Sequence, residues 1–185
     1  MRISGGKFGG LLLKAPKADE VRPTQDRVRE ALFSMLMEAV PGARFLDLYA
    51  GTGAVGLEAL SRGAADVTWV EGSPAVARVL SENVRRIAGE GFAGNVVVSD
   101  VARWLRTAGA HARADIVFAD PPYADAREDG LAGLASRLAG GGVVGPGGVF
   151  VAEVPVEAAV AAAEGWTTLR DRVYGKTRLV LRQLV

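Results

Sequence analysis

The chain has 185 residues, of which 49% are hydrophobic and 23% charged, and its net charge is +1 at neutral pH. This length suits one well-packed domain and is short for two. Cysteine is absent, which excludes a disulfide framework and thiolate metal sites, and the single His111 excludes a histidine cluster, so we expect no metal. There is no signal pattern and no apolar segment of membrane-spanning length, which predicts a cytoplasmic protein.

Positive charge is concentrated near the start of the chain. Residues 1–29 contain seven Lys and Arg side chains against three Asp and Glu, a local net charge of +4. Such asymmetry is typical of segments that contact nucleic-acid phosphates, although ordinary solvated surface is the alternative. The candidate nucleic-acid contacts are Arg2, Lys7, Arg22, Thr24, Arg27 and Arg29.

The first 40 residues read as an extension to a larger domain. Glycine pairs at 5–6 and 9–10 predict short extended segments joined by a tight turn, which would form a small hairpin. Thr24 is a suitable N-cap for a helix over about 25–39, which Pro41-Gly42 would end. We therefore expect a basic hairpin-and-helix extension over 1–40 and the main domain over 41–185.

A glycine-rich motif follows the first strand of this main domain. The strand is expected over 44–49, and Gly51-Thr52-Gly53-Ala54-Val55-Gly56 then fits the G-x-G-x-x-G pattern that opens a helix, here to about residues 61–63. A second strand over 66–70 leads to Glu71, twenty positions after Gly51. An acid at this spacing can accept hydrogen bonds from ribose hydroxyls, so the pattern indicates a cofactor that contains adenosine.

Asp47 helps to choose between the two cofactors that such a loop binds. An acid just before the loop would repel the pyrophosphate of NAD but would suit the ammonium of a methionyl group, which favours S-adenosylmethionine. The alternative is an Asp that only ties down the loop. Ser73-Pro74 begins a helix that runs to about residue 88, and a strand is expected over 95–99. Asp100 follows this strand, where it could accept a hydrogen bond from the adenine amino group or cap the next helix. The candidate cofactor-binding residues are Asp47, Ala50, Gly51, Thr52, Gly53, Glu71, Asp100 and Val101.

The second half of the chain continues the alternation of strands and helices. It predicts strands over 115–119 and 149–153, a helix over about 129–139, an alanine-rich helix over 155–164, and a closing hairpin of strands 167–173 and 177–184. This order predicts an α/β, Rossmann-like fold: a mostly parallel seven-stranded sheet with helices on both faces and a C-terminal antiparallel hairpin. Four strands would end at one ligand crevice.

An unusual segment, Asp120-Pro121-Pro122-Tyr123, directly follows the apolar run Ile116-Val117-Phe118. Proline has no N–H, so the carbonyls of Asp120 and Pro121 can serve as acceptors at the end of the strand. An exocyclic amino group of a nucleobase supplies matching N–H donors, and Tyr123 could stack on the face of the same base. These four residues are the candidate catalytic residues, with a proline-bounded loop as the alternative.

Three separated motifs carry a resemblance to a known family. They are RPTQDRVREALF at 22–33, LDLYAGTGAVGLEALSRGA at 46–64 and DPPY at 120–123, and together they resemble the bacterial guanine-N2 methyltransferases of small-subunit (16S) ribosomal RNA. The Gly-Lys segment near the N-terminus and YGKT at 174–177 extend the resemblance over nearly the whole chain. Tyr49 and Thr52 stand where we would expect Phe and Ser, which keeps an aromatic ring and a hydroxyl.

The resemblance implies a class I S-adenosylmethionine-dependent methyltransferase fold, with S-adenosylmethionine as cofactor. It implies methyl transfer to one loop guanine of an assembled or nearly assembled small subunit, without a metal or a membrane. Three alternatives remain open: an amino-methyltransferase of DNA or another RNA, an NAD-dependent oxidoreductase, which is much less favoured, and a non-catalytic RNA-binding module. The oxidoreductase would leave the Asp-Pro-Pro-Tyr segment without a role.

Overall fold

A computed structural model describes residues 1–15, 26–107, 112–122 and 130–185, except for the side chains of residues 93 and 94. The chain divides into two compact units, Met1–Val101 and Ala102–Val185, and we describe each by itself. Three of the predicted site residues, Arg22, Thr24 and Tyr123, lie outside the described residues.

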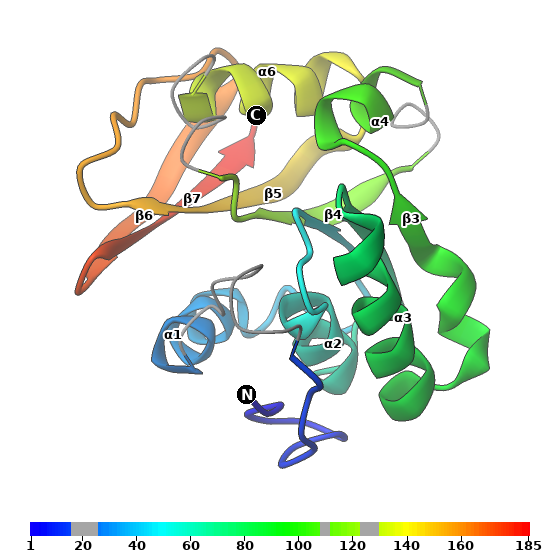
Figure 1. Cartoon of the computed structure of the whole chain (residues 1–185). Helices are drawn as coiled ribbons and strands as arrows, with labels where there is room; N and C mark the ends of the chain where they lie inside the picture. Colours follow the sequence, from blue (N-terminus) through cyan, green and yellow to red (C-terminus); the bar gives the residue numbers. More distant parts are fainter. Residues whose placement is uncertain (16–25, 108–111, 123–129) are drawn as a thin grey trace. The chain divides into compact units, whose positions relative to one another are not determined.

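The first unit consists of helices and parallel strands in alternation (Figure 1). Its elements are α1 (Asp26–Leu36), β1 (Arg44–Leu48), α2 (Ala54–Ser61), β2 (Asp66–Glu71), α3 (Pro74–Ala88), a 3-10 helix η1 (Glu90–Asn95) and β3 (Val96–Val98). The strands lie in the order β3-β2-β1, and β2 pairs in parallel with both neighbours. Except for η1, which was not predicted, each element lies within about three residues of its predicted position, because the hydrophobic periodicity and the caps mark it clearly.

Helix α2 forms the centre of the first unit, and all of its residues are buried. Its close approach to β2 depends on one glycine. A Cβ atom added at Gly56 would come within 2.2 Å of Nε1 of Trp69, whose side chain is fully buried. Any larger residue at position 56 would therefore force the helix and the strand apart.

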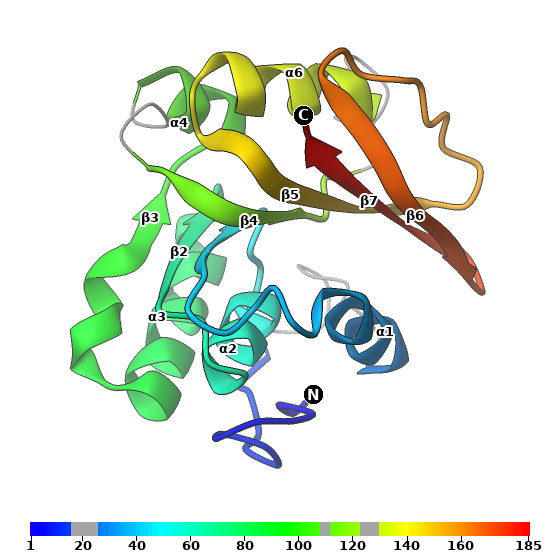
Figure 2. The same cartoon turned by 180° about the vertical axis from the view of Figure 1, so that it is seen from behind.

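The predicted N-terminal hairpin is present and packs on the C-terminal end of α2. Arg2 and Leu12 form an antiparallel bridge, which a hydrogen bond from Leu13 N to Met1 O extends at 3.0 Å. The Ser61 hydroxyl of α2 accepts a hydrogen bond from Phe8 N at 2.8 Å, and both views show the hairpin beside α2 (Figures 1 and 2). The division into compact units falls after residue 101, and the domain boundary at residue 40 stays a prediction.

The second unit contains the antiparallel part of the sheet. Its elements are α4 (Val101–Thr107), which begins at the last residue of the first unit, β4 (Ala114–Ala119), α6 (Gly130–Gly140), β5 (Val144–Pro155), β6 (Trp166–Tyr174) and β7 (Thr177–Leu184). The strand order is β4-β5-β7-β6, with β4 parallel to β5 and the other two pairings antiparallel. Helix α6 covers one face of these strands (Figure 2), where Trp166 Nε1 donates to Ala135 O at 3.1 Å.

The predicted alanine-rich helix over 155–164 is wrong. Strand β5 continues to Pro155, and the residues between it and β6 form a loop. A helix of about ten residues is marginal in water unless packing supports it, even when alanine dominates. Here Arg178 donates to Ala158 O at 3.5 Å and Arg182 donates to Ala161 O, so side chains of β7 bond carbonyls of this loop.

None of the helices in the described part of the chain is both long enough and apolar enough to cross a membrane.

Candidate functional site

The glycine loop between β1 and α2 turns sharply. Tyr49 has φ 57°, and Gly51 and Gly53 follow with φ 55° and 79°. Positive φ is uncommon for a bulky residue such as Tyr, and residues in such conformations cluster at ligand sites. Gly53 N donates to Ala50 O at 2.8 Å, which closes the turn. The sequence therefore positions a compact loop at the N-terminal end of α2, as the motif predicts.

Glu71, at the end of β2, holds this loop from the strand side. Its carboxylate accepts hydrogen bonds from Gly51 N at 2.9 Å and from Ser73 N at 2.8 Å. A carboxylate has about four lone-pair sites, so the two bonds leave acceptor capacity for other donors. The carboxylate is also only partly buried, so a ligand could reach it.

The Asp47 side chain is buried in the first unit, whereas a side chain that contacts a ligand has to be accessible. Its carboxylate is 1% exposed and accepts a hydrogen bond from Gly56 N at 2.9 Å. This geometry supports the alternative in which Asp47 ties down the glycine loop. Direct contact with an ammonium group stays a prediction.

The remaining predicted cofactor residues vary in exposure. Ala50, Thr52 and Val101 are buried, whereas Asp100 is exposed after β3. Ser99 N donates to Glu71 O at 3.0 Å, which brings the end of β3 beside the end of β2. The structure thus gathers the ends of β1, β2 and β3 at one edge of the first unit.

The chemistry of this edge fits S-adenosylmethionine. The positive φ angles of Gly51 and Gly53 shape the loop, and the Glu71 carboxylate offers acceptors of the kind that ribose hydroxyls require. Within the residues that the structure describes, no group of three or more His, Cys, Asp and Glu side chains is placed to hold a metal ion.

The candidate catalytic segment begins where the pairing of β4 ends. The register with β5 runs to Ala119, so Asp120 is the first residue beyond the ladder. Asp120 and Pro121 are partly buried and Pro122 is exposed. The two prolines lack N–H groups, so this strand end is rich in acceptors, as the sequence predicts.

The basic residues near the N-terminus fall into two classes. Arg2, Lys7 and Arg27 are exposed and stay candidates for phosphate contacts. Arg29 is fully buried, and its guanidinium donates to Glu58 at 3.4 Å and to Asp26 at 2.9 Å. The prediction that Arg29 contacts phosphate is therefore not supported by its position, because its guanidinium is used inside the first unit.

Glu58, which was not among the predicted site residues, connects α2 to the N-terminal hairpin and to α1. Its fully buried carboxylate accepts from Ser4 N at 2.7 Å, from Arg29 Nε at 3.4 Å and from Arg62 Nε at 2.9 Å. One signal could have revealed it. A lone acid in the otherwise apolar helix α2 is rarely buried without cationic partners.

Asn83 was also missed, although its position on α3 carries a signal. It lies among Val76, Leu80, Val84 and Ile87, which form the buried stripe of the helix. Asparagine is unfavourable inside helices, so its presence on an apolar stripe indicates hydrogen-bond partners from other segments. The partners are backbone groups of Lys14 and Thr52.

Comparison with known proteins extends these observations to the whole chain. A family model described as conserved hypothetical protein 95 matches residues 1–183. The chain is 36% identical to ribosomal RNA small subunit methyltransferase D of Escherichia coli strain K12, over 99% of this chain and 89% of the relative. It is 31% identical to the protein of the same name in Haemophilus influenzae, over 95% and 89%.

A solved structure supports the same relationship. It is a provisionally named methyltransferase of Escherichia coli with 34% identity and a TM-score of 0.85, over 100% of this chain and 97% of that one. This similarity confirms the predicted Rossmann-like methyltransferase fold with its mostly parallel sheet and C-terminal antiparallel hairpin. The resemblance to small-subunit ribosomal RNA methyltransferases is confirmed by the named relatives. The chain therefore belongs to the family described as conserved hypothetical protein 95, together with these methyltransferases.

Proposed function

We propose that this protein transfers a methyl group from S-adenosylmethionine to the exocyclic N2 of a guanine in small-subunit (16S) ribosomal RNA. The observation that carries the proposal is the full-length match to ribosomal RNA methyltransferases in a chain that places Asp120-Pro121-Pro122-Tyr123 directly after β4. We expect it to act in the cytoplasm on an assembled or nearly assembled small subunit.

The first unit would hold the cofactor. Glu71 would accept from the ribose hydroxyls and Asp100 from the adenine amino group, while Gly51 and Gly53 let the backbone come close. Asp47 would act mainly by fixing the loop, as its bond to Gly56 N supports. S-adenosylmethionine, when bound, supplies an electrophilic methyl group on a positively charged sulfur.

The strand end after β4 would bind the guanine amine. A guanine amine is a poor nucleophile because its lone pair is delocalised into the ring. Acceptor bonds from Asp120 and from the Pro121 carbonyl would favour a pyramidal, more nucleophilic nitrogen, and Tyr123 would stack on the ring. Asp120 takes the amine proton or passes it to water. Orientation alone can lower a barrier by about 7–11 kcal/mol, so a strong base is not required.

Exposed cations near the N-terminus would contact RNA phosphates. Arg2, Lys7 and Arg27 are the described candidates, and Arg22 and Thr24 remain predictions outside the described residues. Because Ser4 and Ser61 anchor the hairpin, deletion of the hairpin would also disturb the first unit. Substitution of Arg2, Lys7 and Arg27 by Gln is therefore the cleaner change. The substitutions should weaken RNA binding. The slope of the logarithm of the binding constant against the logarithm of the salt concentration should become less steep by a little under about one unit for each lost contact.

The deciding experiment is single-turnover methylation of small subunits isolated from cells that lack the enzyme. Mass spectrometry of digested RNA should identify N2-methylguanine as the product, and naked DNA and large-subunit RNA serve as controls. Methyladenine or methylcytosine as the product would contradict the guanine assignment and favour another amino-methyltransferase. Calorimetry with NAD tests the oxidoreductase alternative, since NAD binding as tight as that of S-adenosylmethionine would contradict the proposal.

A further inference from the structure

The side chain of Asn83 joins two segments that are far apart in the sequence. It is fully buried on α3. Its Oδ1 accepts from Lys14 N at 2.9 Å, and its Nδ2 donates to Lys14 O at 3.0 Å and to Thr52 O at 3.0 Å. Lys14 follows the N-terminal hairpin, and Thr52 lies between the two glycines of the cofactor loop.

These three bonds use both N–H donors of the amide and also its oxygen. The Lys14 N–H is a donor, so the atom that faces it must be Oδ1. Pairing with both backbone groups of Lys14 therefore fixes the orientation of the amide, and the second Nδ2 hydrogen then points to Thr52 O. The docking of residue 14 thus determines whether Asn83 can hold the loop.

Asn83 bonds to a different kind of backbone group from those that the acids bond. Glu71 and Asp47 accept from the backbone N–H groups of Gly51 and Gly56, whereas Asn83 donates to the carbonyl of Thr52. Thr52 is 5% exposed, so its carbonyl would lack a replacement partner if Asn83 were lost.

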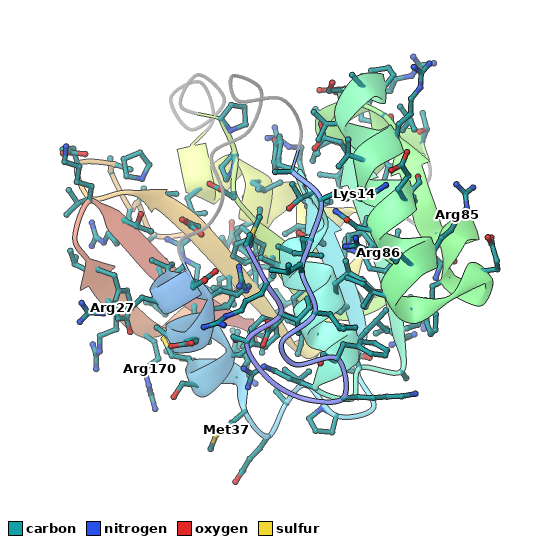
Figure 3. The ribbon with its side chains drawn as sticks, turned by 60° about the horizontal axis from the view of Figure 1, so that its bottom comes forward. Lys14, Arg27, Met37, Arg85, Arg86 and Arg170 are labelled. Atoms are coloured by element: carbon teal, nitrogen blue, oxygen red, sulfur yellow. The ribbon has the colours of Figure 1, made fainter. Side chains whose placement is uncertain are left out.

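Exposed side chains support the same docking from outside. Lys14 Nζ pairs with Glu82 at 2.7 Å, and Arg86 donates to Leu12 O. Figure 3 shows Lys14 and Arg86 between the N-terminal segment and α3, while Arg85 points away. Residues 12–14 are therefore linked to α3 in two ways. The buried link runs through the Lys14 backbone and the exposed link through side chains, and the two can be broken separately.

We propose that Asn83 is a positioning residue that couples the docking of the N-terminal hairpin to the shape of the cofactor loop, so that the hairpin sets the affinity for S-adenosylmethionine. This inference rests on the proposed function, because it takes the loop as the cofactor site. Coupling is reciprocal, so the cofactor also stabilises the docked hairpin.

The test uses two substitutions at one residue. Lys14→Pro removes the N–H that bonds to Asn83 Oδ1, whereas Lys14→Ala keeps the backbone and removes only the exposed ion pair. Calorimetry with S-adenosylmethionine should show affinity at least about fivefold weaker for Lys14→Pro and within about twofold of the parent for Lys14→Ala. Without cofactor, hydrogen exchange of the amides in residues 51–56 should be faster in Lys14→Pro only.

Asn83→Ala provides a second variant and a double-mutant cycle. Because both substitutions break the same link, the double variant should bind the cofactor about as weakly as Asn83→Ala alone. Additive losses would overturn the inference. Should Asn83→Ala fail to fold, Lys14→Pro decides alone, since residue 14 has an exposed side chain.

The outcomes separate this inference from the proposed function. If the parent protein binds the cofactor and Lys14→Pro binds it equally well with unchanged exchange in the loop, the coupling is wrong and the proposed function stands. If the parent binds neither S-adenosylmethionine nor its demethylated product, both are wrong.

Discussion

The loops that follow the strands are held in opposite ways in the two units. In the first unit, the Glu71 carboxylate accepts from loop N–H groups of Gly51 and Ser73, and the Asp47 carboxylate accepts from Gly56 N at the start of α2. In the second, guanidinium groups of Arg178 and Arg182 donate to carbonyls of the loop after β5. The end of β4 is a third case, in which two prolines remove the N–H groups.

This difference indicates what each loop can bind. A loop held by carboxylates lies beside negative charge and offers acceptors, which suits ribose hydroxyls and an ammonium group. The loop held by arginines lies beside positive charge, and its Ala158 and Ala161 carbonyls already accept hydrogen bonds. The proline-rich strand end keeps acceptors, which suits an amine.

Asp120→Ala should have the largest effect. The carboxylate would act on the reacting amine, so its loss should slow methyl transfer at saturating RNA by about 10²–10⁴-fold. Affinity for S-adenosylmethionine should change little, because the residue is assigned to the base and not to the cofactor. Single-turnover rates and calorimetry measure the two quantities.

Asp120→Asn is the matched control for that variant. It keeps an acceptor oxygen and removes the charge, so its rate should lie between those of the parent and Asp120→Ala. Transfer at the parent rate by Asp120→Ala would show that the proline-rich strand end does not act on the amine.

Glu71→Ala should lower the affinity for S-adenosylmethionine. It removes the acceptor of Gly51 N and Ser73 N together with the proposed ribose contact. Bonds to charged groups contribute about 1.5–3 kcal/mol, so cofactor affinity should fall roughly tenfold or more. Glu71→Gln keeps one acceptor and should lose less. A global loss of folding, seen by circular dichroism, would instead give Glu71 a structural role only.

Gly56→Ala tests the packing that supports the first loop. The added Cβ atom would lie 2.2 Å from Trp69 Nε1, and overpacking of this kind costs about 1–3 kcal/mol. Urea unfolding should show this loss. Gly91→Ala, where an added Cβ meets no atom within 4 Å, is the control and should be nearly neutral. Equal stability of the two variants would contradict the close approach of α2 and β2.

Asp171→Asn should have the smallest effect. It concerns the arginines of the second unit, because Asp171 is an ion-pair partner of Arg178. The hydrogen-bonded Arg178 guanidinium lowers the pKa of Asp171, so this carboxylate stabilises the fold above its unfolded pKa of about 3.9. The stabilisation is lost as pH falls through the lowered pKa. The side chain is 35% exposed, so the difference at pH 7 should be at most about 1 kcal/mol. Urea unfolding should show a difference at pH 7 that shrinks as the pH falls below the unfolded pKa.

Local sequence signals predicted most of the fold. Ser73-Pro74 marks the start of α3, and its cap is observed, since Ser73 Oγ accepts from Val76 N at 3.4 Å. The glycine loop and the closing hairpin are also found where predicted. The prediction of an alanine-rich helix over 155–164 failed because the conformation of these residues depends on Arg178 and Arg182. These arginines follow later in the sequence and bond carbonyls of the segment.

The candidate site was predictable only in part, for the same reason. Glu71 has a fixed spacing from the glycine motif, so its neighbourhood could be inferred. Two of the pairs follow local helix spacing, Arg29 with Asp26 at i,i+3 and Glu58 with Arg62 at i,i+4. The Arg29–Glu58 pair and the bonds of Asn83 are set by the packing of distant segments, and no spacing rule encodes them. Charge alone therefore suggested a surface role for Arg29, whereas burial gives it an internal one.

The anchoring of the N-terminal hairpin also bears on how the chain is made. Ser4 bonds to Glu58, 54 residues later, and Lys14 bonds to Asn83, 69 residues later. Contacts across long chain segments close slowly, so we expect the hairpin to be anchored only after β1 and β2 have paired. Pulse-labelled exchange during refolding should show Lys14 N, which bonds to Asn83, protected after the amides of β2, and the reverse order would contradict this. On the ribosome, residues 1–15, which are synthesised before the rest of their unit, would be the last part of that unit to find their place.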